Sequence, residues 1–119
     1  MSSSMRKSEI RACAAAERQG HFDRSKAESD LDDVMRSLGI GSGAGPSVVP
    51  GVAVYLCDDW ADENRIRLEL EKRGHKIVEV RSTTWVVEDG TDEDVIAVAF
   101  DTPCLPAEWR EDSPSPAMR

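Results

Sequence analysis

Four carboxylates stand close together near the middle of the chain, and carboxylate oxygens are the ligands that hard divalent cations prefer. They follow the apolar run 52–57, where open α/β sheets place their ligands. The four are Asp58, Asp59, Asp62 and Glu63. The same residue types commonly begin helices, because they cap free backbone N–H groups and complement the helix dipole. Capping is the more common role, so the sequence predicts no metal site and no cofactor, with Asp58 and Asp59 as the only candidates for a cation.

A second acidic run lies further along the chain and consists of Glu88, Asp89, Asp92, Glu93 and Asp94. It lacks the Asp-x-Asp-x-Asp-Gly spacing of a calcium-binding loop. Two interpretations stay open. The run is a solvated turn between strands, or it is a compact negative knob that imitates phosphates and occupies a basic groove on a partner.

The formal net charge is −8, from 15 lysines and arginines against 23 aspartates and glutamates. A protein this acidic repels phosphate backbones, so we expect no direct binding of nucleic acid. The same field attracts a basic surface on another protein, including one that normally holds nucleic acid.

The cysteines and histidines form no catalytic or metal-binding pattern. Cys13, Cys57 and Cys104 are widely spaced, and His21 and His75 lie far apart in the sequence. We therefore do not expect an enzyme, and we expect free thiols, which are typical of a reducing compartment. No apolar run approaches the roughly 20 residues that cross a bilayer, so the sequence predicts a cytoplasmic protein without membrane contact.

The two most apolar segments, 52–57 and 95–100, contain no charged residue, as in strands that are buried on both faces. We place them at the centre of a sheet. A helix over about 60–73 and a strand over 76–81 follow the first segment and predict a βαβ unit with parallel strands. Residues 85–87 and 95–100 flank the acidic run and predict a β-hairpin. The expected fold class is α/β (α+β), with a small mixed four-stranded sheet, one βαβ crossover and a β-hairpin.

The predicted organisation is a helical hairpin at 1–38, a Gly/Pro-rich linker at 39–51, the βαβ-β core at 52–101 and a Pro-rich tail at 102–119. The hairpin consists of helices over 5–19 and 26–38. The second helix begins with a capping-box pattern at Ser25 and Glu28. The hairpin either covers the open face of the sheet or serves as a separate binding arm.

Apolar and aromatic residues outside the expected strands suggest partner contacts. On the helix 60–73, Ile66 and Leu70 lie nearly opposite Leu68, so one side is either covered by another element or exposed. We assign Ile66 and Leu70 to a partner contact, with Trp60 and Trp109, because aromatic residues dominate interface hot spots. The predicted partner-binding residues are Trp60, Asp62, Glu63, Ile66, Leu70, Glu88, Asp89, Asp92, Glu93, Asp94 and Trp109.

The segment Tyr55-Leu56-Cys57-Asp58-Asp59, followed by a helix and by Arg73-Gly74-His75-Lys76-Ile77-Val78-Glu79-Val80, resembles the opening of a response-regulator receiver domain. The resemblance implies that Asp58 and Asp59 bind magnesium and that an aspartate after a later strand accepts phosphate, for which Asp101 is the candidate. The likeness ends there, because no second helix is expected between 76–81 and 95–100.

Three functions follow from these patterns. The favoured one is a small acidic regulatory protein, an inhibitor or adaptor of the kind that phages and mobile elements encode. It would engage a basic partner surface, such as that of nucleic-acid-handling machinery, by mimicking nucleic-acid charge. The second is a metal-dependent or phospho-acceptor module that uses Asp58, Asp59 and Asp101. The third is a subunit of a larger assembly, joined through the N-terminal helices.

Overall fold

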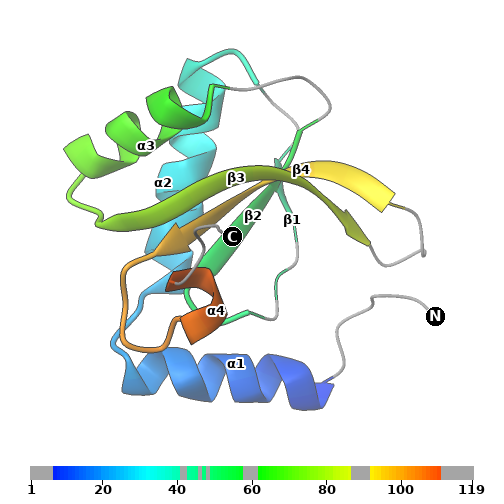
Figure 1. The fold of residues 1–119 in the computed structure, drawn as a ribbon, viewed down its shortest axis with the longest axis vertical. Helices are drawn as coiled ribbons and strands as arrows, with labels where there is room; N and C mark the ends of the chain where they lie inside the picture. Colours follow the sequence, from blue (N-terminus) through cyan, green and yellow to red (C-terminus); the bar gives the residue numbers. More distant parts are fainter. Residues whose placement is uncertain are drawn as a thin grey trace, which may run out of the picture.

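The structure is a computed structural model, and it describes residues 7–40, 43–45, 47, 49–57, 62–86 and 92–110. Three strands form an antiparallel sheet: β2 (Val52–Leu56), β4 (Asp92–Phe100) and β3 (Ile77–Val86). The short strand β1 (Gly43–Gly45) pairs with the outer edge of β2. Both apolar strands, β2 and β4, therefore occupy the centre, as their composition predicts (Figure 1).

The strand β4 comes last in the sequence but lies between the other two. It runs antiparallel to β2 and to β3, so β2 and β3 point the same way across it. The helix α3 (Glu63–Lys72) connects them. The predicted mixed sheet is wrong because the insertion of β4 separates the two parallel strands, and every pairing that results is antiparallel.

Most of the two predicted strands, 76–81 and 85–87, belongs to one continuous strand, β3, which spans Ile77–Val86; residue 87 lies outside the described residues. The polar residues between them also pair with β4, with Ser82 opposite Ile96 and Thr84 opposite Asp94. Threonine is a favourable strand residue, and an edge strand tolerates polar side chains that face solvent. Both Ser82 and Thr84 are exposed, so polarity here indicates an edge rather than a break.

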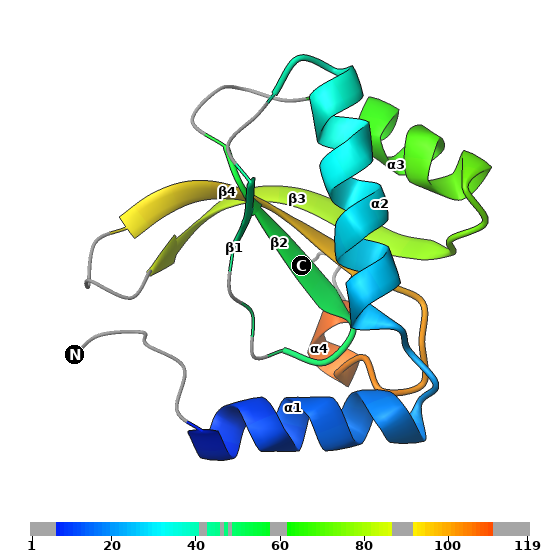
Figure 2. The same ribbon diagram turned by 180° about the vertical axis from the view of Figure 1, so that it is seen from behind.

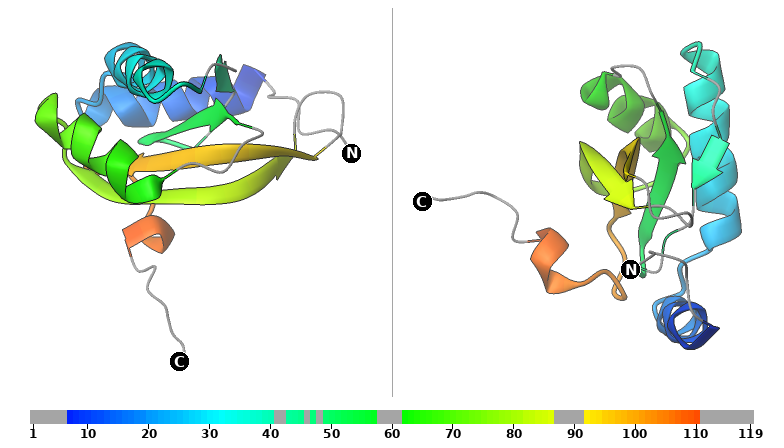
Figure 3. Two further views of the ribbon diagram at one scale, coloured as in Figure 1. Left: turned by 90° about the horizontal axis from the view of Figure 1, so that it is seen from above. Right: turned by 90° about the vertical axis from the view of Figure 1, so that its right-hand side faces the viewer.

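The helices α2 (Arg24–Ser37) and α3 cover one face of the sheet (Figures 2 and 3). The buried stripe of α2, formed by Leu31, Val34 and Met35, packs in one core with Tyr55 and Ile66. The helix begins after Asp23, whose carboxylate accepts a hydrogen bond from the backbone N–H of Lys26 at 3.1 Å. Asp23 therefore caps the helix in place of the predicted Ser25.

The helix α1 (Lys7–Gln19) does not fold back along α2. It lies across the end of the sheet where β2 begins, while α2 stands on the sheet face (Figure 1). The two helices therefore do not lie side by side, and of the two only α2 covers the face of the sheet (Figure 1). The carbonyl of Ile40, after α2, accepts a hydrogen bond from the Tyr55 hydroxyl at 3.2 Å.

The opposite face of the sheet is covered by the segment that contains the short helix α4 (Ala107–Arg110). Leu105 and Trp109 pack there against residues of β2 and β4, and Trp109 is only 7% exposed. The guanidinium of Arg81 lies 4.4 Å from the Trp109 ring centroid, a cation–π contact. Residues 102–110 are thus folded onto the sheet, whereas 111–119 lie outside the described residues.

Candidate functional site

The receiver-like arrangement requires Asp101 to lie beside the residues that follow β2. The backbone N–H of Cys57, just after β2, donates to the carbonyl of Asp94 at 3.0 Å. At the other end of the sheet, the N–H of Phe100 donates to the carbonyl of Gly51 at 2.8 Å. A five-residue strand separates the two ends by about 17 Å. Because β2 and β4 are antiparallel, Asp101 and the residue that follows β2 lie at opposite ends of the sheet, which does not favour the phospho-acceptor interpretation.

Asp58 and Asp59 themselves lie outside the described residues. Within the described part of the chain, no group of three or more His, Cys, Asp or Glu side chains is placed to hold a metal ion. Nor does any helix there have the length and apolar character needed to cross a membrane.

Several predicted partner-binding residues are buried. Ile66 and Leu70 are fully buried in the core beneath α3, while Leu68 on the opposite side of that helix is 54% exposed. Trp109 is buried against the sheet. These three side chains are therefore not exposed at the surface, because each lies on the apolar side of a helix that packs against the sheet. Trp60, Glu88 and Asp89 lie outside the described residues.

The two carboxylates at the start of α3 have local roles. Asp62 caps the helix, accepting a hydrogen bond from the backbone N–H of Arg65 at 3.2 Å. Glu63 accepts a hydrogen bond from the backbone N–H of Ser82 on β3 at 2.7 Å. The side chain of Asp62 stays exposed, whereas that of Glu63 is half-buried and bound to the edge strand β3.

The first three residues of β4, Asp92, Glu93 and Asp94, form what we call the acidic end of the sheet. They pair with the uncharged residues Val86, Trp85 and Thr84 of β3. Asp92 and Asp94 are exposed, and within the described residues neither forms an ion pair. Asp92 and Asp94 therefore keep their negative charge facing solvent.

Most carboxylates on α2 and α3 are paired with basic neighbours. Asp32 pairs with Arg36 at 3.0 Å, and Glu71 with Arg67 at 3.4 Å, each four residues apart on one helix. Such pairs cancel charge locally even when they add little stability. The excess negative charge of the described sheet is thus concentrated at the acidic end.

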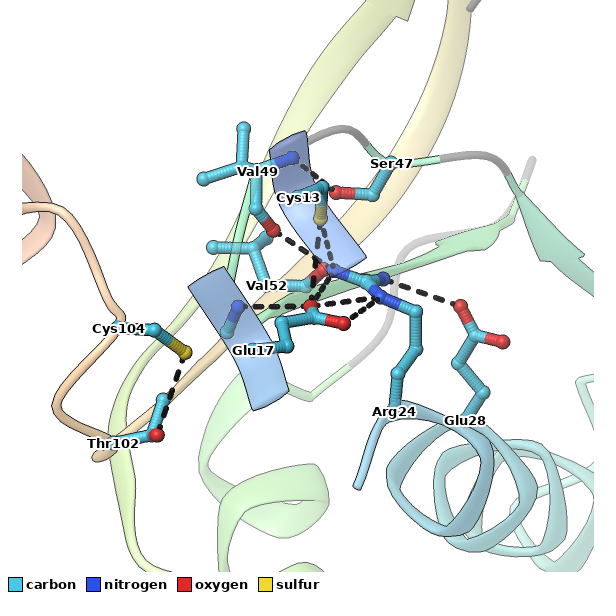
Figure 4. Close-up of polar contacts among 10 residues, drawn as sticks. Cys13, Glu17, Arg24, Glu28, Ser47, Val49, Val52, Thr102 and Cys104 are labelled. Atoms are coloured by element: carbon cyan, nitrogen blue, oxygen red, sulfur yellow. Dashed lines mark hydrogen bonds and ion pairs between the residues drawn. The ribbon is translucent and has the colours of Figure 1, made fainter. Parts of the chain in front are cut away.

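A buried ion pair fixes the opposite end of the sheet (Figure 4). Glu17 of α1 is 5% exposed and accepts hydrogen bonds from Arg24 Nε at 2.9 Å and from the Gly51 N–H at 3.2 Å. Arg24 also donates to the carbonyls of Val49 and Val52, at 2.9 and 3.0 Å. The cluster ties α1, α2 and the start of β2 together.

The Glu17–Arg24 cluster has a structural role. Burial alone would lower the pKa of Arg24, but the hydrogen bond and charge of Glu17 outweigh it and raise that pKa. The thiol of Cys13 lies 3.6 Å from Glu17, and burial raises its pKa, so it is not an activated nucleophile. No buried side-chain N or O atom of the described residues lacks a partner, so the cluster offers no open position to a ligand.

Beside this cluster is a cleft of about 470 Å³, which we call the His75 cleft. Three connections line it: the α1–α2 turn with the start of α2, the α3–β3 turn, and the segment after β4. Its lining residues are Gly20, His21, Phe22, Asp23, Lys26, Arg73, Gly74, His75, Lys76, Phe100, Asp101, Thr102 and Pro103. It lies at the end of the sheet remote from the acidic end.

Aromatic rings form part of the cleft lining. The ring centroids of Phe22 and Phe100 are 5.3 Å apart, and those of His75 and Phe100 are 5.2 Å apart in a T-shaped arrangement. The Arg24 guanidinium lies 6.0 Å from the Phe22 ring centroid. These contacts hold the rings in fixed relative positions.

Two polar residues of the cleft lining, His75 and Lys26, both contact the carboxylate of Asp30. His75 Nε2 and Asp30 Oδ2 are 2.6 Å apart, and Lys26 Nζ lies 2.7 Å from the same carboxylate. The hydrogen bond from Lys26, followed by that of His75, lowers the pKa of Asp30. Within the described residues, the ammonium of Lys76 has no carboxylate partner, and the nearest carboxylate to Arg73, that of Asp33, is 3.7 Å away.

His21 and His75 lie far apart in the sequence and form no metal-binding pattern, so the sequence pattern did not predict the cleft. One signal was present, because the dipeptide Gly-His follows both α1 and α3. Both dipeptides line the cleft. His21 also adopts a positive φ of 57°, an uncommon conformation for a residue with a side chain.

Comparisons of the chain with protein-family models, with curated proteins and with solved structures found no match.

Proposed function

We propose that this protein is a small regulatory binding protein that engages a basic surface of a partner protein through the acidic end of its sheet. The observation that carries the proposal is the contrast in charge pairing. Asp92 and Asp94 face solvent without an ion pair in the described structure, whereas most of the carboxylates on α2 and α3 are paired. A surface of this kind steers a basic partner and accelerates its association.

The partner class follows from the charge pattern. The exposed carboxylates of Asp92 and Asp94, together with Glu88 and Asp89 nearby in the sequence, carry negative charge as the phosphates of a nucleic acid do. A basic groove that holds nucleic acid is therefore a suitable partner surface, and the protein would act there as an inhibitor or adaptor.

The alternative role as an assembly subunit is less well supported. The apolar stripe of α2 is buried on the sheet and cannot join another chain. The described exposed residues of α1 include Arg11, Arg18 and Gln19, which are polar.

The test compares two charge-reversed variants. The first carries Asp92→Lys, Glu93→Lys and Asp94→Lys. The control carries Asp33→Lys, Glu71→Lys and Glu108→Lys, three exposed carboxylates elsewhere on the surface. Both change the net charge equally, so a generic charge effect acts on both.

Proteins captured by cross-linking in cells would be identified, and their affinities measured with each variant at low and high salt. We expect the first variant to lose the partner and the control to retain it, and the wild-type affinity to fall as salt screens the exposed charges. Equal losses in both variants, or an affinity indifferent to salt, would refute the proposal.

A further inference from the structure

The His75 cleft has the size of a small-molecule site. Its volume of about 470 Å³ lies within the range of ligand pockets, roughly 300–1,000 Å³. All of its lining residues belong to the described structure. Loops held by a rigid scaffold line it, an arrangement that commonly carries binding sites.

The cleft offers a surface for a flat ring. Phe22 is only partly buried, although it packs on the core, and its ring contacts Phe100 in a tilted arrangement and lies 6.0 Å from the Arg24 guanidinium. A planar group laid against this side chain would make stacking or edge contacts with rings that are already held in place.

The cleft also offers positive charge. Lys76 and Arg73 lie at the α3–β3 turn and line the cleft with Lys26. The two acidic lining residues are already engaged, because Asp23 caps α2 and Asp101 pairs with Arg110 at 2.8 Å. An incoming anion therefore meets Lys76 and Arg73, while these two carboxylates are occupied by their own partners.

We infer that the His75 cleft binds a small organic anion with one flat ring, an aryl carboxylate or an aryl phosphate. The ring lies against Phe22, and the anionic group contacts Lys76 and Arg73. This site is independent of the acidic end, which lies at the far end of β4.

The test uses benzoate and phenyl phosphate as probes and follows backbone amide shifts of the full chain by NMR. We expect shifts confined to residues 20–26, 73–76 and 100–103, with dissociation constants of about millimolar for ligands of this size. Benzyl alcohol, which has the ring without the charge, and inorganic phosphate, which has charge without the ring, should each bind at least roughly tenfold more weakly.

Two variants with equal charge changes locate the site. Lys76→Glu should weaken binding of phenyl phosphate roughly tenfold or more. Lys72→Glu, on the exposed last turn of α3 outside the cleft, should leave it unchanged. Equal binding by the two variants, equal binding of inorganic phosphate and phenyl phosphate, or no shifts at high millimolar probe would overturn the inference.

Discussion

Glu17 and Arg24 show how two charged side chains hold a junction of three elements. Arg24 meets one carboxylate from α1 and two backbone carbonyls near the start of β2. Each of these partners would be costly to bury unpaired. The pair therefore specifies where α1 ends relative to the sheet, and with it the position of the turn that lines the His75 cleft.

Gly51 belongs to the same junction and leaves no free space for a side chain. Its φ is +78°, and an added Cβ would lie 2.7 Å from the Cγ2 of Thr102. Gly39 has a similar φ of +85° with nothing within 4 Å. We expect Gly51→Ala to lower the free energy of unfolding by about 2–4 kcal/mol, and Gly39→Ala by only about 1 kcal/mol. Urea denaturation of both variants measures the difference, and equal losses would contradict the crowding argument.

The Asp30 carboxylate should make stability depend on pH. Its pKa is lowered by Lys26 and then by His75, so its contribution is present above the unfolded-state pKa and is lost as pH falls through the folded-state pKa. We expect Asp30→Asn to be less stable than wild type by about 1 kcal/mol at neutral pH.

Urea denaturation from neutral to acidic pH tests this expectation, and the gap between Asp30→Asn and wild type should close in the acidic range. Asp33→Asn is the control, since Asp33 is 58% exposed and lies 3.7 Å from its arginine. It should change little at any pH. A gap for Asp30→Asn that persists unchanged at acidic pH would show that the carboxylate charge is not responsible.

At the scale of single residues, the sequence identifies buried positions where apolar residues recur at helical spacing. The stripe on α2 identifies Leu31 and Met35 as core residues, and both are buried. The sequence does not identify Glu17 as buried, because a glutamate in an alanine-rich helix is typical of a solvated position. Its partner Arg24 is seven residues away across a turn rather than one helical turn along, so no local pattern signals the pair.

At the scale of elements, α3 both packs on the sheet and protects its edge. Glu63 accepts a hydrogen bond from the backbone N–H of Ser82, and Arg67 donates to the carbonyl of Ile77 at 2.9 Å. These are backbone groups of the edge strand β3. An edge strand with unpaired groups is a template for pairing with another chain, and the two side chains obstruct it.

Removal of both protecting side chains should promote self-association. We expect the double variant Glu63→Ala, Arg67→Ala to form oligomers with rising concentration, while wild type does not change its mass in parallel runs. Light scattering coupled to size exclusion measures this. The control is Arg65→Ala, Glu69→Ala, which removes an exposed pair of the same helix. Oligomers in the control, or none in the double variant, would argue against edge protection.

The elements themselves were predicted unevenly. Uninterrupted apolar runs identified β2 and β4 as central, because only a strand buried on both faces carries such a composition. The strand β1 was missed because Gly43, Ala44 and Gly45 have little strand preference. Its pairing with β2 is imposed by the sheet. The Gly-rich composition indicated a linker and gave no sign of the pairing.

At the scale of the whole molecule, the two candidate sites lie at opposite ends of the sheet. β4 begins at the acidic end and reaches the His75 cleft at Phe100. The net charge of −8 was evident from the sequence, but its distribution depends on which carboxylates meet arginines and lysines after folding. The cleft could not be predicted for the same reason, since its three connections are distant in the sequence.

The central position of β4 also sets the order in which the sheet can assemble. β3 and β4 are joined by a short connection, so their hairpin closes with little loss of chain entropy. β2 must then pair with β4, with Val52 opposite Ala99, although α3 and β3 separate the two strands in the sequence. Pairings distant in sequence slow folding. Until these pairings form, β2 and β4 both expose apolar surface. The slowest step of folding is therefore also the one in which the chain is most prone to aggregate.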